Sequence, residues 1–214
     1  MAARQKSQVP GKTVGRLGFY RRIISQVLST SLRHMHSHEI ARRAGVSAAQ
    51  VRRDLMVVGF SGNPKLGYEL KGLHKSLSDF LDGADQERRL ALVGVGNLGK
   101  ALLSYFSKGK SNMVIAVAFD ADPEKAGRLF NGCRCCRLDD MQQVLRKEGI
   151  KVAVLAVPAE AAQGVAARLV AADVRGILNF APVALQVPAS VYVENVDVTM
   201  YLEKVAFFGR QKSV

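Results

Sequence analysis

Three glycines near the middle of the chain have the spacing of a dinucleotide-binding turn. Gly94, Gly96 and Gly99 stand in a G-x-G-x-x-G pattern between an apolar run of strand length and residues that favour a helix. In such a turn the first glycine permits a tight bend, the second lets the backbone approach a pyrophosphate, and the third allows close helix-strand packing. The amides that open the helix face the anion at the positive end of its dipole. The residues expected to bind the phosphates are Gly94, Val95, Gly96, Asn97, Leu98 and Gly99.

An acidic residue further along the chain fits the same kind of site. Asp120 follows a second strand-like run, residues 113–119, and lies 21 positions after Gly99. At this distance an NAD-type site carries a carboxylate for the adenosine ribose. The alternative is that Asp120 merely ends a strand at a turn, because Asp122 and Pro123 follow it.

Strand-like and helical runs alternate through the second half of the chain. Strands are expected at 152–157, 176–180 and 191–194, and helices at about 139–147 and 159–171. This alternation predicts an α/β domain with a Rossmann-like, doubly wound parallel sheet. Ligands of such sheets lie beyond the carboxyl ends of the strands. The residues expected to line that crevice with the glycine turn and Asp120 are Val157, Pro158, Asn179, Phe180, Ala181 and Pro182.

The charge of the chain is concentrated in its N-terminal third. The 214 residues have a formal net charge of +13. Residues 1–80 hold 14 Lys and Arg against 4 Asp and Glu, a net of +10, whereas residues 81–214 hold 17 against 14, a net of +3. The N-terminal third therefore has the charge of a nucleic-acid-binding domain, and the remainder is a near-neutral ligand domain.

The basic third has the pattern of a helix-turn-helix. A helix over residues 16–30 is followed by a second one, capped by Ser37, that runs to Ala44. Gly45 supplies the turn, and residues 47–50 (Ser-Ala-Ala-Gln) form a capping box for a third helix that ends near Val58. Residues near the N-terminus of such a third helix can reach base edges in the major groove. The alternative is a solvated basic helix face.

A segment rich in turn-forming residues, 60–68, follows the third helix and is typical of the hairpin wing of a winged helix. Lys65 at its tip is expected to contact phosphate, whereas Arg52 contacts phosphate or supports the fold. The residues expected to contact DNA are Ser47, Gln50, Arg52, Arg53, Lys65 and Tyr68.

The two ends of the chain differ in character. Residues 1–15 are expected to be a flexible basic arm. Near the other end, Asp197 can cap a last helix with an apolar stripe that packs on its own domain or on a partner subunit. The expected organisation is an arm over 1–15, a winged helix over 16–84, a Rossmann domain over 85–196 and a dimerisation helix over 197–214.

Two clusters of possible metal ligands are expected to bind no metal. Cys133, Cys135 and Cys136 form neither an even disulfide framework nor a C-x-x-C pair, and we interpret them as thiols in a strand or loop of a reduced cytoplasmic protein, with a redox sensor as the alternative. The histidines at 34, 36 and 38 have no fourth ligand nearby and are expected in a surface loop. No apolar run is long enough to span a membrane, so no membrane partner is expected.

Taken together, these motifs resemble one family, the Rex redox-sensing transcriptional repressors, from about Tyr20 to Phe208. The residues that carry the resemblance are 46–55, 94–99, 119–125, 156–162, 178–182 and 194–197. The resemblance implies a homodimer with a swapped C-terminal helix that binds NADH and NAD⁺, and it adds Lys125 to the nucleotide site. It also implies a switch formed by Arg22, Tyr105 and Asp197. The chain departs from the family at Arg53, where lysine is common, and at Val198, where an aromatic residue is common.

We therefore expect a repressor, not an enzyme, that binds palindromic double-stranded operator DNA as a homodimer and is released by NADH. A dehydrogenase is disfavoured because only about 30 residues follow the sheet and no general acid is apparent. Two alternatives stay open: a regulator that senses CoA or an NADP species, and one that senses a thiol oxidant through its cysteines.

Overall fold

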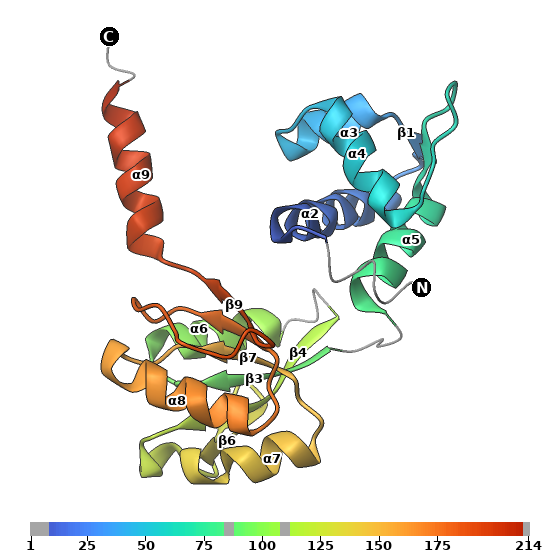
Figure 1. The fold of residues 1–214 in the computed structure, drawn as a ribbon. Coiled ribbons are helices and arrows are strands. Elements are labelled where there is room, and N and C mark those ends of the chain that lie inside the picture. Colours follow the sequence, from blue (N-terminus) through green and yellow to red (C-terminus); the bar gives the residue numbers. More distant parts are fainter. Residues whose placement is uncertain (1–8, 84–87, 108–111, 212–214) are drawn as a thin grey trace. The chain divides into compact units, whose positions relative to one another are not determined.

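The chain divides into two compact units, Met1–Gln86 and Glu87–Val214, called unit 1 and unit 2 here and described separately. The computed structural model describes residues 9–83, 88–107 and 112–211. Figure 1 shows the course of the chain through both units.

Unit 1 is a winged helix-turn-helix. Its helices bury one apolar core. Each helix contributes at least one fully buried side chain to it, for example Leu17, Ile40, Leu55 and Leu73. The wing is a tight turn closed by a bridge between Asn63 and Gly67, and the strand after it pairs with an earlier strand, Tyr68 opposite Met35. Its elements are α2 (Gly11–Leu28), β1 (His34–Met35), α3 (Ser37–Ala44), α4 (Ala48–Val58), β2 (Tyr68–Glu69) and α5 (Leu70–Asp82).

The helix starts of unit 1 differ from the sequence-based prediction in three places. Helix α2 begins at Gly11, so residues 11–15 are helical and do not belong to a flexible arm; residues 1–8 of that arm lie outside the described residues. Helix α3 is capped by His36 and not by Ser37, because the Glu39 carboxylate accepts a hydrogen bond from the His36 N–H at 2.7 Å. Ser47 caps α4, but only half of the capping box forms, since the Gln50 side chain is bonded elsewhere.

Unit 2 contains a seven-stranded sheet in the order β5-β6-β4-β3-β7-β8-β9. All neighbouring strands are parallel except the edge pair β5-β6, which is antiparallel. The doubly wound parallel sheet is therefore confirmed, with one antiparallel edge strand that the sequence analysis missed. The strands are β3 (Arg88–Val93), β4 (Met113–Asp120), β5 (Leu129–Phe130), β6 (Cys133–Arg137), β7 (Val152–Leu155), β8 (Gly176–Asn179) and β9 (Tyr192–Asn195).

Helices cover both faces of this sheet, as Figure 1 shows. Helices α7 (Met141–Lys147) and α8 (Ala159–Ala171) pack on the face to which Val93, Phe119 and Leu155 point. Helix α6 (Asn97–Phe106) packs on the opposite face, which Leu92 and Cys135 share. Because successive residues of a strand point to opposite faces, both faces can be buried only when the strand is apolar throughout. The carboxyl ends of the central parallel strands are thereby held together at one end of the sheet.

The cysteine-rich segment, expected in a strand or a loop, forms strand β6. Asn131 and Gly132 connect β5 to β6 with φ values of 50° and 82°. Two consecutive positive φ values define the tight hairpin turn that Asn-Gly sequences favour. The Asn-Gly pair was the overlooked signal.

The last helix, α9 (Val198–Gln211), exposes its apolar side chains. Asp197 accepts a hydrogen bond from the Met200 N–H at 3.0 Å and so caps the helix as predicted. Apolar side chains are 51–69% exposed along α9. Within the described part of the chain, this apolar stripe of α9 does not pack on its own domain. Of the two alternatives, packing on a partner subunit stays a prediction. These side chains are Val198, Met200, Tyr201, Leu202, Val205, Phe207 and Phe208.

Candidate functional site

The glycine turn after β3 has a geometry that larger residues would disrupt. Gly94 has φ +97°, and a Cβ on it would lie 2.3 Å from the carbonyl oxygen of Ala156. A Cβ on Gly99 would lie 2.0 Å from the carbonyl oxygen of Gly94. A Cβ on Gly96, in contrast, meets nothing within 4 Å. The first and third glycines are therefore required by packing, and the second borders open space where a ligand can approach.

The start of α6 lies directly after this turn. Its N-cap is Gly96, which offers no side chain to the first amides of the helix. Asn97 and Leu98, in the first turn, are exposed. Amides without a capping side chain, together with the helix dipole, favour an anion at this position.

Asp120 lies at the carboxyl end of β4 and is bonded to the glycine turn. Its Oδ2 accepts hydrogen bonds from the Val95 N–H at 2.7 Å and from Lys125 Nζ at 3.1 Å, while Oδ1 accepts from the Asp122 N–H at 2.9 Å. Burial alone would raise the pKa of this carboxyl, but the backbone N–H groups and Lys125 lower it below its ordinary value. An ionised carboxylate is thus fixed beside the phosphate-binding turn.

A cavity of about 250 Å³ adjoins Asp120. Its walls come from the loop after β4, from the end of β6 and from α8. Arg137 and Leu138, which the sequence analysis did not select, line it because β6 pairs with β4 and ends beside it. Arg137 is the last residue of β6 and Leu138 follows it, but the sequence alone does not define where this strand ends. The lining residues are Asp120, Ala121, Pro123, Arg137, Leu138, Asp139 and Arg168.

The predicted residues after β7 and β8 lie at the same edge of the sheet. Leu155 pairs with Val93 on one side and with Asn179 on the other. Pro158 caps α8, and Val157 packs close to Gly94. The structure therefore brings the loops that follow β3, β7 and β8 together at the carboxyl end of the sheet.

Asn179 organises the loop that follows β8. It is fully buried, and its Nδ2 donates hydrogen bonds to the Val183 carbonyl at 2.8 Å and to Asn195 Oδ1 at 2.8 Å. Its Oδ1 accepts one from the Ala181 N–H at 3.0 Å. Asn195 ends β9, two residues before Asp197, so this amide ties the loop of residues 180–183 to the start of α9.

The three predicted switch residues are divided between the units. In unit 2, Tyr105 is 59% exposed with its ring edge-on to Phe106, and Asp197 caps α9. In unit 1, Arg22 is exposed, with its guanidinium 5.0 Å from the centroid of the Phe19 ring. Each is accessible within its own unit, and their joint role stays a prediction.

A buried acid anchors the predicted recognition helix α4 in unit 1. Asp54 is 2% exposed and accepts hydrogen bonds from Arg16 at 2.6 and 2.7 Å, as well as from the Tyr20 hydroxyl at 2.8 Å. Gln50 Nε2 donates a further one at 2.8 Å. Burial alone would raise the pKa of Asp54, but the donors Arg16, Tyr20 and Gln50 lower it. The ionised carboxylate therefore fixes α4 on α2.

Four of the six predicted DNA contacts are exposed, whereas Gln50 is half-buried and Tyr68 is buried. Arg53 is exposed on α4, and Lys65 is exposed in the turn of the wing. Arg52 is exposed and donates a hydrogen bond to the Ser37 hydroxyl at 3.1 Å, which suits a supporting role as well as a phosphate contact. Tyr68 was predicted to contact DNA, but it is only 8% exposed and packs in the core of unit 1. Its aromatic ring fills the core under the wing, so we remove it from the DNA surface.

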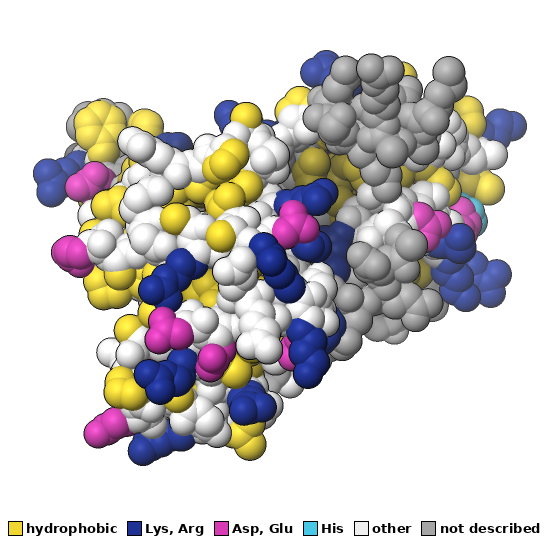
Figure 2. All heavy atoms as spheres, turned by 60° about the horizontal axis from the view of Figure 1, so that its bottom comes forward, with side chains coloured by type: hydrophobic (Ala, Val, Ile, Leu, Met, Phe, Trp, Pro, Cys, Tyr) yellow, Lys and Arg dark blue, Asp and Glu magenta, His cyan; other side chains and the backbone are white. Residues whose placement is uncertain are grey.

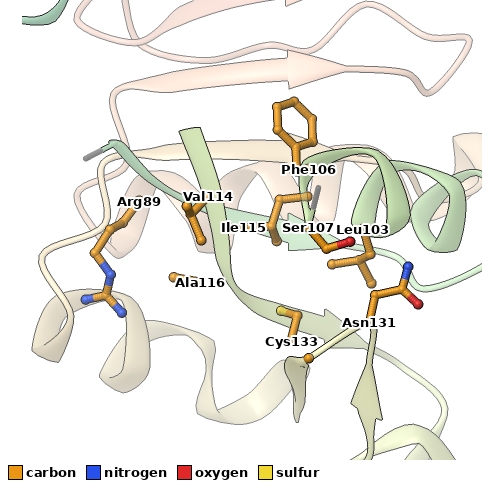
Figure 3. A pocket seen from close by; sticks show the side chains of 10 residues that line it. Arg89, Leu103, Phe106, Ser107, Val114, Ile115, Ala116, Asn131 and Cys133 are labelled. Carbon is orange, nitrogen blue, oxygen red and sulfur yellow. The ribbon is translucent and has the colours of Figure 1, made fainter. Parts of the chain in front are cut away.

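A second cavity, of about 400 Å³, lies near the amino ends of the strands, away from the glycine turn. Figure 3 shows Cys133 and Asn131 of the β5-β6 hairpin beside Leu103 and Ser107 of the α6 end. Burial, and to a lesser extent the neighbouring thiols, raises the pKa of Cys133 to about 11. The thiolate is the reactive form of cysteine, so this thiol is unsuited to sensing oxidants.

Many surface charges of unit 2 are paired. Arg89 contacts Glu148 at 2.7 Å, Arg168 contacts Asp139 at 3.2 Å, and Lys151 contacts Asp173. On the face drawn in Figure 2, basic and acidic side chains lie interspersed. Over residues 9–83, 88–107 and 112–211, no group of three His, Cys, Asp or Glu could hold a metal ion, and no helix is long and apolar enough to cross a membrane.

Comparisons with known proteins separate the chain into the same two functional parts. Residues 8–55 match the family described as "Putative DNA-binding protein N-terminus". Residues 85–183 match the family described as "CoA binding domain". Neither match covers half of the chain.

Full-length relatives decide the family. A redox-sensing transcriptional repressor Rex of Syntrophobacter fumaroxidans is 38% identical over 202 residues, which cover 94% of this chain and 96% of the relative. The Rex protein of Streptomyces coelicolor is 37% identical over 205 residues, or 96% of this chain and 79% of the relative. The chain belongs to the Rex family. Members of this family are transcriptional repressors and not enzymes, as the sequence analysis expected.

Solved Rex structures have the same fold. RSP in complex with β-NAD⁺ and operator DNA matches with a TM-score of 0.86 and 30% identity, covering 95% of this chain and 94% of that one. RSP in complex with β-NADH matches with a TM-score of 0.82 and 30% identity, covering 96% of both chains. The Rex combination of a winged helix and a Rossmann-like domain is therefore confirmed.

Proposed function

We propose that this Rex protein represses transcription by binding palindromic operator DNA as a homodimer and that NADH releases it, whereas NAD⁺ permits binding. The observation that carries the proposal is the glycine turn joined to an ionised Asp120 through the Val95 N–H. The same proposal places the protein in the cytoplasm, where its operators are.

The nucleotide site is built from the carboxyl edge of the sheet. The pyrophosphate lies at the turn of residues 94–99 and the start of α6, and the adenosine ribose lies at Asp120, with Lys125 beside it. The nicotinamide lies toward the loop of residues 179–182, with Val157 and Pro158 between the two ends. Since the two redox forms differ only in the nicotinamide, discrimination belongs to this end, where Tyr105 and Asp197 are proposed to respond.

The DNA surface is built from α4 and the wing of unit 1. Ser47 caps the helix, Gln50 and Arg53 face base edges, and Arg52 and Lys65 contact phosphates. Phosphate contacts set position and general affinity, whereas base contacts set the sequence. Two copies of α4, one from each subunit, read the two halves of a palindrome.

Helix α9 supplies the proposed dimer contact. Its apolar stripe is unburied within the described chain. An exposed stripe of this size is typical of an interaction site. A second subunit is the partner that a palindromic operator requires.

CoA is the alternative ligand, because residues 85–183 match a family named for it. Asp120 disfavours a 2′-phosphate, and therefore NADP species, through charge repulsion. Sensing through thiols is disfavoured because burial raises the pKa of Cys133, Cys135 and Cys136 alike.

The test selects operators from a random DNA pool and then measures DNA affinity with NADH, NAD⁺, NADPH or CoA present. NADH is expected to weaken binding by about 100-fold relative to NAD⁺, which corresponds to about 2.7 kcal/mol. Equal affinity with both NAD forms would contradict the proposal, and release by CoA alone would favour the alternative.

Two substitutions test the proposed nucleotide site by calorimetry. Asp120→Ala is expected to weaken NADH and NAD⁺ alike, by about tenfold, because it acts on the shared ribose. Tyr105→Phe is expected to change the ratio of the two affinities, since it lies toward the redox-active end. Equal losses for both nucleotides in both variants would contradict this assignment.

A further inference from the structure

The amide of Gln50 has a fixed direction on the recognition helix. Its Nε2 donates to Oδ1 of Asp54, which lies one turn further along α4. Asp54 is buried and also accepts hydrogen bonds from Arg16 and Tyr20. An ionised carboxylate accepts hydrogen bonds and donates none, so the nitrogen of the amide must face Asp54 and the oxygen cannot.

This direction decides what Gln50 can offer to DNA. After the bond to Asp54, the amide retains Oε1 as an acceptor and its second N–H as a donor. An acceptor beside a donor matches adenine, which presents its N6 amine and N7 together in the major groove. Guanine presents two acceptors, O6 and N7, so it leaves Oε1 without a donor.

The position of Gln50 on the helix allows such a contact. Gln50 is the third residue of α4 and its backbone N–H is bonded to the capping Ser47. The first residues of a recognition helix are those that contact base edges. Arg53, an exposed neighbour three residues later, has the donor fork that suits guanine. The two side chains therefore select different bases.

We propose that Asp54 is a positioning residue that turns the Gln50 acceptor toward the DNA, so that Gln50 selects adenine at one position in each half-site. The proposal rests on the proposed operator binding. Arg16 on α2 keeps Asp54 ionised, so the direction of the amide is set from outside the recognition helix. Ser47 fixes the backbone, and Asp54 fixes the side chain.

The first experiment combines a protein variant with a base analogue. Each adenine of the selected operator is replaced in turn by purine, which lacks the 6-amino group, and the DNA affinities of wild type and Gln50→Ala are measured without nucleotide. At one position of each half-site, the replacement is expected to weaken wild type by about tenfold and Gln50→Ala by much less. Arg53→Ala serves as the matched control and is expected to keep the purine penalty. Equal penalties for wild type and Gln50→Ala at every adenine would overturn the proposal.

The second experiment tests the direction of the amide in the free full-length protein. In ¹⁵N NMR spectra, one of the two Gln50 amide protons is expected to be shifted downfield and protected from exchange, unlike those of the exposed Gln26. Asp54→Asn can donate to Gln50 Oε1 and turn the amide over, so the purine penalty is expected to shrink in this variant. Gln50 amide signals equivalent to those of Gln26 would overturn the positioning role even if Asp54→Asn does not fold.

The two levels of failure are distinguishable. A protein that selects no sequence from the random pool contradicts the proposed function itself. A protein that selects an operator, but shows the same purine penalties with and without Gln50, contradicts only the role of Gln50.

Discussion

The two units each hold a buried polar side chain next to their proposed functional residues, but they use different kinds of group. Unit 1 uses the charged Asp54, and unit 2 uses the neutral Asn179. Asp54 receives donors from side chains on two helices, whereas Asn179 bonds mainly to the backbone of one loop. A charge needs a charged partner and so fixes one helix against another. An amide satisfies both donors and acceptors and so shapes a loop that faces a ligand.

Removal of the charged anchor is expected to have the largest effect. Asp54→Ala leaves Arg16 without its bidentate partner; because the Arg16 side chain is 27% exposed, the expected loss lies at the lower end of the about 3–5 kcal/mol that breaking a fully buried ion pair costs. Hydrogen exchange of amides in unit 1 measures this cost apart from unit 2. Arg53→Ala, on the same helix but exposed, is the control and is expected to change stability by less than about 0.5 kcal/mol. Similar losses in both variants would show that Asp54 is not an anchor.

Removal of the neutral anchor is expected to have a smaller effect, which is confined to unit 2. Asn179→Ala leaves buried partners unsatisfied, at a cost of about 1–3 kcal/mol, and loosens the loop of residues 180–183. NADH affinity in calorimetry is expected to fall with it. Gln163→Ala is the matched control, because Gln163 also bonds a loop backbone, at Gln186, but on the surface. A loss of stability in unit 1 as large as in unit 2 would break the comparison.

Acid titration is expected to have the smallest effect on stability. It distinguishes the two anchors because only one of them is titratable. The pKa of Asp54 is lowered in the folded state, so its stabilisation is complete above the ordinary aspartate pKa of about 3.9 and is lost as the pH falls through the lower folded value. Asn179 does not titrate; in its unit the pKa is lowered for Asp120, which is bonded to the glycine turn, and for Asp173 on the surface.

Asp120→Asn is therefore expected to flatten the acid dependence of unit 2 while that of unit 1 stays steep. The change in slope is at most about 1.4 kcal/mol per pH unit for one proton. The measurement is the free energy of unfolding of each unit, obtained from hydrogen exchange between pH 5 and pH 3 at constant ionic strength. Unchanged slopes in unit 2 would exclude Asp120 as its acid-sensitive group.

The sequence predicts the elements that have a strong period and misses contacts that depend on tertiary packing. Helix α8 has the predicted bounds, 159–171, because its apolar face and the preceding proline define it locally. The burial of Asp54 was not predicted, since its partners Arg16 and Tyr20 lie 38 and 34 residues away. Tyr68 was assigned to DNA because its place in the wing is visible in the sequence and its packing against the core is not. The Asn-Gly turn before β6 was predictable and was overlooked.

The glycine turn was predictable because each of its constraints acts on the backbone alone. The link from Asn179 to Asn195 was not, because it joins neighbouring strands β8 and β9 across 16 residues and depends on their register. Side-chain pairing between elements is thus the part of the site that requires a structure.

The unburied stripe of α9 has a consequence for how much of the protein a cell must make. A chain without a partner would leave at least seven large apolar side chains in water. If these side chains pair between two copies, assembly follows mass action, and halving the number of molecules reduces the number of dimers more than proportionately. Promoter strength at its own gene would then tune the repressor's sensitivity, independently of any nucleotide.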